Sequence, residues 1–166
     1  MQTKDVTGIH IEGHIHIHDP LEKITYVNKR NAIHYENMSI ALAQSLSNNN
    51  TGGFIYQMDF GNGGTAIDPT RNYTEIRHAT GTTYTDIFCT CLLDYGEPSG
   101  QTAFDATTAT NSTYTFDELG LRSYSTSGES MLLTHVIFHP VLKSLNRLIQ
   151  IDYTVRIQSL TGLVSV

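Results

Sequence analysis

The sequence of 166 residues has no tryptophan, only two cysteines and few charged side chains. Charged residues make up 16% of it and no run of Lys or Arg is present, which argues against direct contact with nucleic acid. No apolar run approaches the ~20 residues that a membrane-spanning helix needs, so we expect no membrane partner. Residues 1–5 lack the apolar segment of a secretory signal, and we expect a protein kept in a cytoplasm-like compartment.

The two cysteines, Cys89 and Cys91, lie two residues apart in an apolar segment. On a β-strand this spacing holds them ~6.5–7 Å apart on one face, a separation that strains a disulfide. A four-cysteine metal site would need a second pair, which the sequence does not contain. We therefore predict two free, half-buried thiols.

The sequence is instead rich in Thr, Ser, Asn, Gln and Gly. Such a composition is common in β-sandwiches and unsuited to a helical bundle. A chain of this length fits one domain and buries roughly 70% of its unfolded surface. We predict a single, mainly β domain over residues 1–166.

The N-terminal part of the sequence predicts a hairpin followed by one helix. The hairpin is expected over residues 8–28, with its turn at Asp19 and Pro20. Apolar residues at helical spacing predict a helix over residues 32–46, with Asn31 as its N-cap. This is the only substantial helix that the sequence predicts.

The remaining segment, residues 54–158, predicts the strands of a sandwich. The strand before the last is expected to end at His139 and Pro140. In the last strand, polar residues alternate with Ile149, Ile151, Tyr153, Val155 and Ile157. Burial of one such side chain contributes about 1.5–3 kcal/mol, which places this strand at the centre of the core. Seven or eight strands and one helix indicate an antiparallel β-sandwich or jelly roll.

The first strand has the most unusual pattern in the sequence, an alternation of isoleucine with polar residues. Successive side chains of a strand point to opposite faces. One face would carry Ile9, Ile11, Ile15 and Ile17, and the other His10, Glu12, His14, His16 and His18. A strand face with four histidines is either a metal site or a polar surface.

The pair His14 and His16 can chelate a transition-metal ion, with an oxygen from Glu12 or Glu22. Together with Gly8, these residues resemble the first motif of the cupins, small sandwich proteins that include metal-dependent enzymes. The spacing from His16 to Glu22 is too long, no glycine closes the motif, and the second cupin motif is absent. A cupin-like metal-dependent enzyme is therefore only the alternative hypothesis.

Two other arrangements of this strand face remain open. In a closed ring or trimer, the pair His14 and His16 of each subunit could meet around a metal ion on the symmetry axis. The interpretation that we favour is a polar face that contacts solvent or a neighbouring subunit. Its candidate contact residues are His10, Glu12, His14, His16 and His18.

No motif for nucleophilic or phosphate chemistry is complete, and we assign no catalytic residue. The sequence contains no Gly-x-Ser-x-Gly elbow. The glycine-rich segment 61–65 lacks the Lys-Ser/Thr of a phosphate-binding loop and fits a tight turn. Cys89 and Cys91 lie within a predicted strand, where nothing activates a thiolate.

Several segments follow one another in a characteristic order: residues 31–43, 60–65, 116–121, 132–144 and 148–156. They correspond to a helix after a hairpin, a Gly-rich turn, a Glu-Leu-Gly-Leu strand, and two closing strands joined by a Pro-containing bend. In this order the chain resembles a family of small tailed-bacteriophage virion proteins, over most of its length. The section 66–77 is short by comparison, as if an insertion were missing.

The resemblance implies a non-enzymatic structural protein of the virion, assembled in the host cytoplasm. Proteins of this kind are neck or collar components, baseplate or fibre-attachment parts, or capsid decorations. The small size and the absence of fibrous repeats favour a neck or collar component at the head–tail junction. The expected partners are copies of itself in a symmetric ring and other neck, tail or capsid proteins. A carbohydrate-binding tail module is a further alternative.

Overall fold

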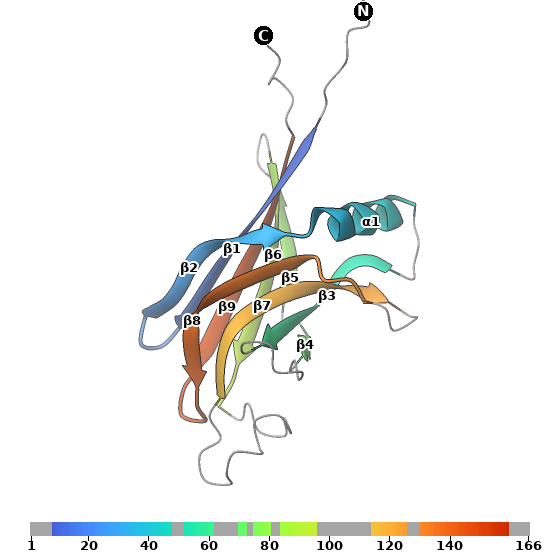
Figure 1. The fold of residues 1–166 in the computed structure, drawn as a ribbon. Helices are drawn as coiled ribbons and strands as arrows, with labels where there is room; N and C mark the ends of the chain where they lie inside the picture. The colour runs from blue at the N-terminus through green and yellow to red at the C-terminus, as the bar shows by residue number, and fades with distance from the viewer. Residues whose placement is uncertain are drawn as a thin grey trace, which may run out of the picture.

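The computed structural model contains nine β-strands and one α-helix in the part of the chain that it describes, residues 8–47, 52–61, 70–72, 75–80, 84–95, 114–125 and 130–159 (Figure 1). The elements are β1 (Ile9–Asp19), β2 (Ile24–Ile33), α1 (Tyr35–Leu46), β3 (Gly52–Gly61), β4 (Thr70–Asn72), β5 (Glu75–Thr80), β6 (Tyr84–Leu93), β7 (Tyr114–Ser125), β8 (Thr134–Lys143) and β9 (Ile149–Ser159). All strand pairs are antiparallel, in the order β4-β3-β7-β8-β2-β1-β9-β6-β5. The predicted mainly β, sandwich-like fold with one helix after an N-terminal hairpin is confirmed.

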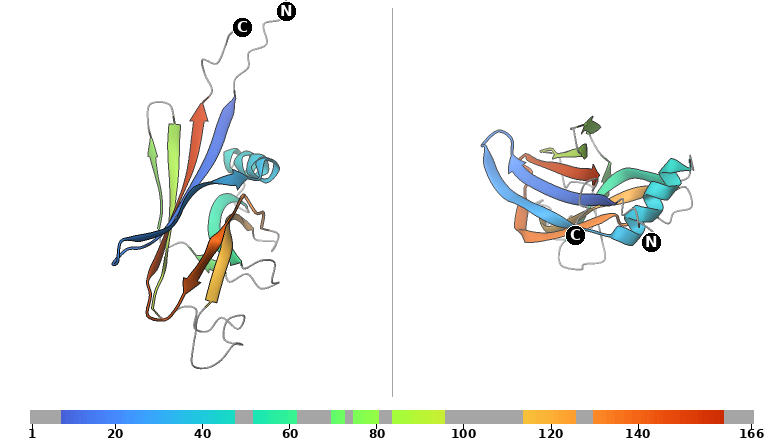
Figure 2. Two further views of the ribbon diagram at one scale, coloured as in Figure 1. Left: turned by 60° about the vertical axis from the view of Figure 1, so that its left-hand side comes forward. Right: turned by 90° about the horizontal axis from the view of Figure 1, so that it is seen from above.

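The sheet is divided into two layers by one weak pairing. β2 and β8 pair only at Ala32↔His135 and Ile33↔Thr134. On one side of this junction lie β2, β1, β9, β6 and β5, and on the other β8, β7, β3 and β4. The two layers diverge from the junction and face each other, and α1 lies beside β3 at one end (Figures 1 and 2).

The core lies between the two layers. One layer contributes Ile15, Ile17, Ile149, Ile151 and Tyr153, and the other Met58, Phe60, Phe116, Leu119 and Leu121, each at most 2% exposed. β9 lies between β1 and β6, and its residues Ile149, Ile151, Tyr153 and Val155 are each at most 1% exposed, so the predicted place of this strand in the core is confirmed except at Ile157, which is only partly buried. Cys89 and Cys91 face the same core as free thiols that are fully rather than half buried, and burial raises the pKa of Cys89 to about 12.

The hairpin is longer and the helix shorter than the sequence predicted. β2 continues to Ile33, and the helix begins at Tyr35 with His34 as an N-cap that makes no side-chain capping bond. Asn31 pairs with Gly13 of β1, and its side-chain amide donates to the hydroxyl of Tyr153. The prediction of Asn31 as N-cap is therefore wrong, because strand pairing with β1 holds this residue in the hairpin.

The predicted end of a strand at His139 and Pro140 is also wrong, since β8 runs on to Lys143. The register with β7 shifts between Phe116 and Glu118, opposite this part of β8. Proline is tolerated at such irregularities because a donor is not required there. Of the predicted loops, 101–112 and most of 61–65 lie outside the described residues.

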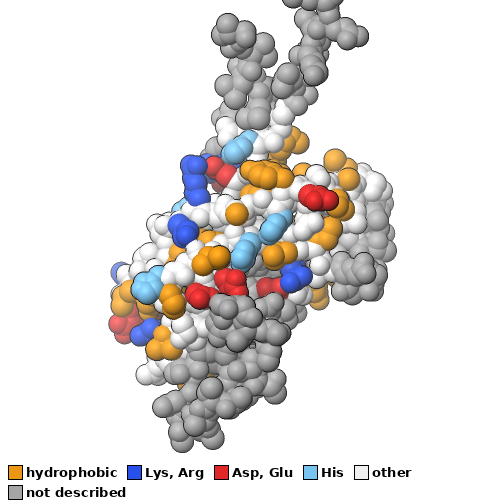
Figure 3. Space-filling model, in the orientation of Figure 1, with side chains coloured by type: hydrophobic (Ala, Val, Ile, Leu, Met, Phe, Trp, Pro, Cys, Tyr) orange, Lys and Arg blue, Asp and Glu red, His pale blue; other side chains and the backbone are white. Residues whose placement is uncertain are grey.

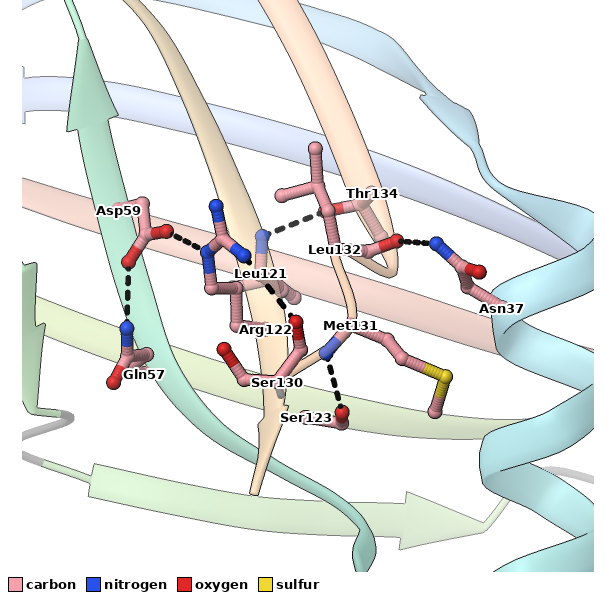
Figure 4. A network of polar contacts seen from close by, with 10 residues as sticks. All are labelled: Asn37, Gln57, Asp59, Leu121, Arg122, Ser123, Ser130, Met131, Leu132 and Thr134. Carbon is pink, nitrogen blue, oxygen red and sulfur yellow. Dashed lines mark hydrogen bonds and ion pairs between the residues drawn. The ribbon is translucent and has the colours of Figure 1, made fainter. Parts of the chain in front are cut away.

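A network of hydrogen bonds and one ion pair connects residues 130–132, just before β8, to β3, β7 and α1 (Figure 4). The carboxylate of Asp59 in β3 accepts hydrogen bonds from Gln57 and from the guanidinium of Arg122 in β7. Arg122 also donates to the carbonyl of Ser130. The amide of Asn37 in α1 donates to the carbonyl of Leu132, 2.8 Å away. The network thus joins β3, β7 and α1 through one short segment.

No helix among the described residues is long and apolar enough to cross a membrane.

Candidate metal centre on the histidine strand

The predicted alternation along β1 is present in the structure. Ile11, Ile15 and Ile17 are buried, whereas Ile9 is 65% exposed. At Ile9 the strand pairs only with β9, because its pairing with β2 starts at Gly13. The histidines of β1 lie on the outer face of their layer, away from the core.

Two of these histidines lie close to a carboxylate of the neighbouring strand. Asp152 of β9 is directly opposite His16 in the register. Its Oδ2 lies 2.8 Å from Nε2 of His18. The rings of His16 and His18 are stacked, with centroids 4.3 Å apart and planes within 8°. One ligand atom from each of the three side chains lies within 4.8 Å of the others, so this group could hold a metal ion.

Neutral side chains hold the members of this group in position. The Oδ1 of Asp152 accepts a hydrogen bond from Gln150 at 2.9 Å and one from Thr90 at 3.3 Å. The Nε2 of His16 lies 3.1 Å from the hydroxyl of Thr25 in β2. Three strands besides β1 therefore contribute to the arrangement, since Thr90 belongs to β6.

The local electrostatics keep His16 neutral. Burial, and then repulsion from His18, lower the pKa of His16 below its ordinary value of 6.5, and Asp152 opposes the shift only in part. A neutral imidazole retains a lone pair on one ring nitrogen, which is the form that binds metals. At neutral pH the uncharged form of His16 is therefore the prevailing one.

The other residues of the histidine strand lie outside this group. His14 is exposed and stands opposite Arg30 and Thr154, not opposite an acid. His10 and Arg30 approach Glu12, at 3.8 and 3.6 Å. The structure therefore brings His16 together with His18 and Asp152 rather than with His14. Asp152 was not among the site residues predicted from the sequence, although the alternation of the last strand already placed it on the polar face.

An ion pair lies on the same outer face, further along the sheet. Arg156 donates from Nε and Nη2 to the two carboxylate oxygens of Asp86, at 2.7 and 2.8 Å. Asp86 is 6% exposed, and the hydrogen bonds from Arg156 are the main cause that lowers its pKa below the ordinary value of 3.8. With Glu12, His14 and Phe88, the pair lines a polar hollow of about 390 Å³.

We expect Asp86→Asn to lower the free energy of unfolding at pH 7 by about 1.5–3 kcal/mol, because it removes the charge-assisted, bidentate ion pair with Arg156. Since the folded-state pKa is lowered, the stabilisation is complete above about pH 5 and is lost as the pH falls through that pKa. Urea unfolding of both proteins at several pH values measures this. The difference in free energy of unfolding between the wild type and Asp86→Asn should become smaller below about pH 4. A difference that grows on acidification would contradict the assignment.

A second polar group lies on the outer face of the other layer. Nε2 of His135 is 2.9 Å from Oε2 of Glu118, and the ring of His135 stacks against His34. His135 and Glu118 border a hollow of about 150 Å³ that also reaches Asp59 and Arg122. Figure 3 shows this side of the molecule, where histidine, acidic and basic side chains gather among hydrophobic ones. Every carboxylate named here already has a cationic or histidine partner.

Two apolar features also lie at the surface of the described residues. An apolar pocket of about 360 Å³ opens between α1, β3 and the layer that contains β9, lined among others by Met38, Leu42 and Val155. Phe54, Tyr56 and Tyr124 form an aromatic group in which Phe54 and Tyr56 are 49% and 41% exposed.

The site on the outer face consists of a two-histidine, one-carboxylate group with an ion pair further along the same face. Comparison of the chain with protein-family models, curated proteins and solved structures finds no match.

Proposed function

We propose that the chain is a non-enzymatic structural protein of a tailed-phage virion, a neck or collar component that binds neighbouring subunits through β-strand edges. The order of the sequence segments supports the class of protein. The observation that carries the mode of assembly is the open edge of β2. Because β2 and β8 pair at two positions only, residues 24–31 have no backbone partner on that side within the described part of the chain.

An edge of this kind is a template for a strand from another chain. Its unpaired N–H and C=O groups can continue the sheet across a subunit boundary. The turn end of the β1–β2 hairpin also projects away from the rest of the sandwich, where a neighbour can reach it (Figure 2). The hairpin thereby offers backbone hydrogen bonds without any rearrangement of the core.

Exposed apolar side chains flank the open edge. Leu21 and Ile24 at the turn end of the hairpin are 66% and 46% exposed. Across the junction, Ile137 of β8 is 63% exposed, and its carbonyl accepts a hydrogen bond from the ammonium of Lys29. Burial of apolar area beside paired backbone is the usual composition of a stable subunit contact.

We expect the purified protein to form closed oligomers. Ile24→Lys and Ile137→Lys should each raise the protein concentration that assembly requires by at least tenfold. Lysine at a strand edge opposes pairing with another chain. Leu46→Lys is the matched control, since Leu46 on α1 is 88% exposed and remote from the hairpin. Sedimentation velocity over a dilution series measures the effect. A protein that stays monomeric at high concentration, or equal loss in the control, would contradict the proposal.

The position in the virion is tested separately, by imaging particles with a bound antibody against this protein. Label at the head–tail junction supports the neck or collar assignment. Label at the baseplate, on fibres or on capsid faces would replace it with the corresponding structural role. Particles without label would contradict a virion role altogether.

A carbohydrate-binding module is the second candidate, favoured by the aromatic group of Phe54, Tyr56 and Tyr124. Exposed aromatic rings can stack on the apolar faces of sugars, as they do on other flat partners. The rings of Phe54 and Tyr124 lie 4.9 Å apart, so part of the group is already satisfied internally. Binding on a glycan array that Tyr56→Ala abolishes would favour this function over the first.

A further inference from the structure

We propose that His16, His18 and Asp152 bind one divalent transition-metal ion per chain, of the zinc, nickel or copper class. This inference is independent of the virion role, because it depends only on the three side chains and their surroundings. The site belongs to one protomer and needs no symmetry axis.

The donor set selects the class of ion. Two imidazole nitrogens and one carboxylate oxygen suit zinc, nickel, copper and iron(II), whereas calcium and magnesium prefer oxygen donors alone. Three protein ligands on one side of an ion leave further positions for water. His18 and Asp152 have side chains that are 19% and 37% exposed, so an ion and its water ligands can enter from solvent.

Binding requires the two imidazole rings to turn, because stacked and nearly parallel rings do not direct their lone pairs at one point, but the donor atoms are already close together. Bonds of about 2.0–2.1 Å in a tetrahedral site place neighbouring donor atoms roughly 3.3–3.5 Å apart. In the structure, His18 and Asp152 are 2.8 Å apart and all three donors lie within 4.8 Å of one another. An ion would replace the hydrogen bond between His18 and Asp152. The strand spacing sets these separations, because His16 and Asp152 are register partners and His18 follows two residues later.

The surroundings resemble the outer shell of a metal site. Ligating carboxylates are themselves hydrogen-bonded, and these partners hold them in the binding orientation. Here Gln150 and Thr90 both hold the Oδ1 of Asp152, which leaves Oδ2 directed at His18. No Lys or Arg within the described residues forms an ion pair with Asp152, so no fixed cation competes with the metal.

Calorimetric titration of the untagged protein with zinc chloride tests the proposal. We expect one ion per chain, and affinity at least tenfold weaker in both His18→Ala and Asp152→Asn. His139→Ala is the matched control, because His139 is exposed on β8 in the other layer and should leave binding unchanged. Absence of binding, one ion per two or three chains, or equal loss in His139→Ala would overturn the proposal.

A spectroscopic readout separates direct ligation from a general effect on the fold. Copper(II) bound to the wild-type protein should show electron paramagnetic resonance couplings from two nitrogen ligands, and His18→Ala should lose one of them. Thermal unfolding without metal shows whether the variants are folded. A spectrum unchanged by His18→Ala but altered by His14→Ala would assign the ion to loose chelation along the exposed strand, and the proposed site would be wrong.

Discussion

Arg122→Met is expected to lower the free energy of unfolding by about 3–5 kcal/mol, the range for a buried charge that loses its partner. Asp59 is only 6% exposed, and the guanidinium of Arg122 is the cation in contact with its carboxylate. After the substitution only Gln57 would remain to donate to Asp59 among the contacts of the network in Figure 4. The bond from Arg122 to the carbonyl of Ser130 would be lost as well.

A double-mutant cycle identifies the cause. The buried carboxylate of Asp59, left without a cation, is expected to cause most of the loss in free energy of unfolding. In that case Asp59→Asn in the Arg122→Met background restores part of the stability, because an amide carries no charge to desolvate. Arg30→Met is the control: Arg30 is 80% exposed and lies 3.6 Å from Glu12, a pair worth less than about 1 kcal/mol. Urea unfolding followed by far-ultraviolet circular dichroism suits a chain without tryptophan. Equal losses in Arg122→Met and Arg30→Met would refute the argument.

The local patterns of the sequence were sufficient for the architecture but not for the pairing of distant strands. Alternation of Ile with polar residues placed β1 and β9 correctly, because a two-residue period leaves no other way to bury one face. The same alternation placed His16, His18 and Asp152 on polar faces. It could not show that β1 and β9 are neighbours, which depends on the topology of the whole sheet. The third ligand of the candidate metal centre therefore emerges only from the register between them.

A strand irregularity explains why one polar residue is buried contrary to its pattern. In β8 the buried positions are Thr134, Val136 and Phe138, and then Val141 and Lys143, so the inward set changes from even to odd numbers at Pro140. Such a shift moves every later side chain to the opposite face. Lys143 is fully buried as a result, and burial lowers its pKa to about 8, while Leu142 is 45% exposed. A regular alternation would have reversed these two positions.

Gly120→Ala is expected to cost about 2–3 kcal/mol, since a methyl group at this position meets backbone. Gly120 lies in β7, and a Cβ there would clash with the carbonyl oxygen of Thr134 and lie 2.7 Å from a methyl of Leu132. The backbone cannot yield easily, because Leu121 accepts a bond from the N–H of Leu133 and donates one to the hydroxyl of Thr134. The alanine would therefore separate β7 from the segment that enters β8.

Gly61→Ala is the matched comparison, in the strand next to β7. The three atoms nearest to a Cβ at Gly61 all belong to the side chain of Glu118, which can rotate away at the expense of its contact with His135. We expect a loss of about 1 kcal/mol for Gly61→Ala, from one weakened hydrogen bond. Thermal and urea unfolding of the two variants rank them directly. Stability equal to wild type in Gly120→Ala would mean that β7 and the entry to β8 lie further apart than this structure places them, and the polar network built on Arg122 would then need another geometry.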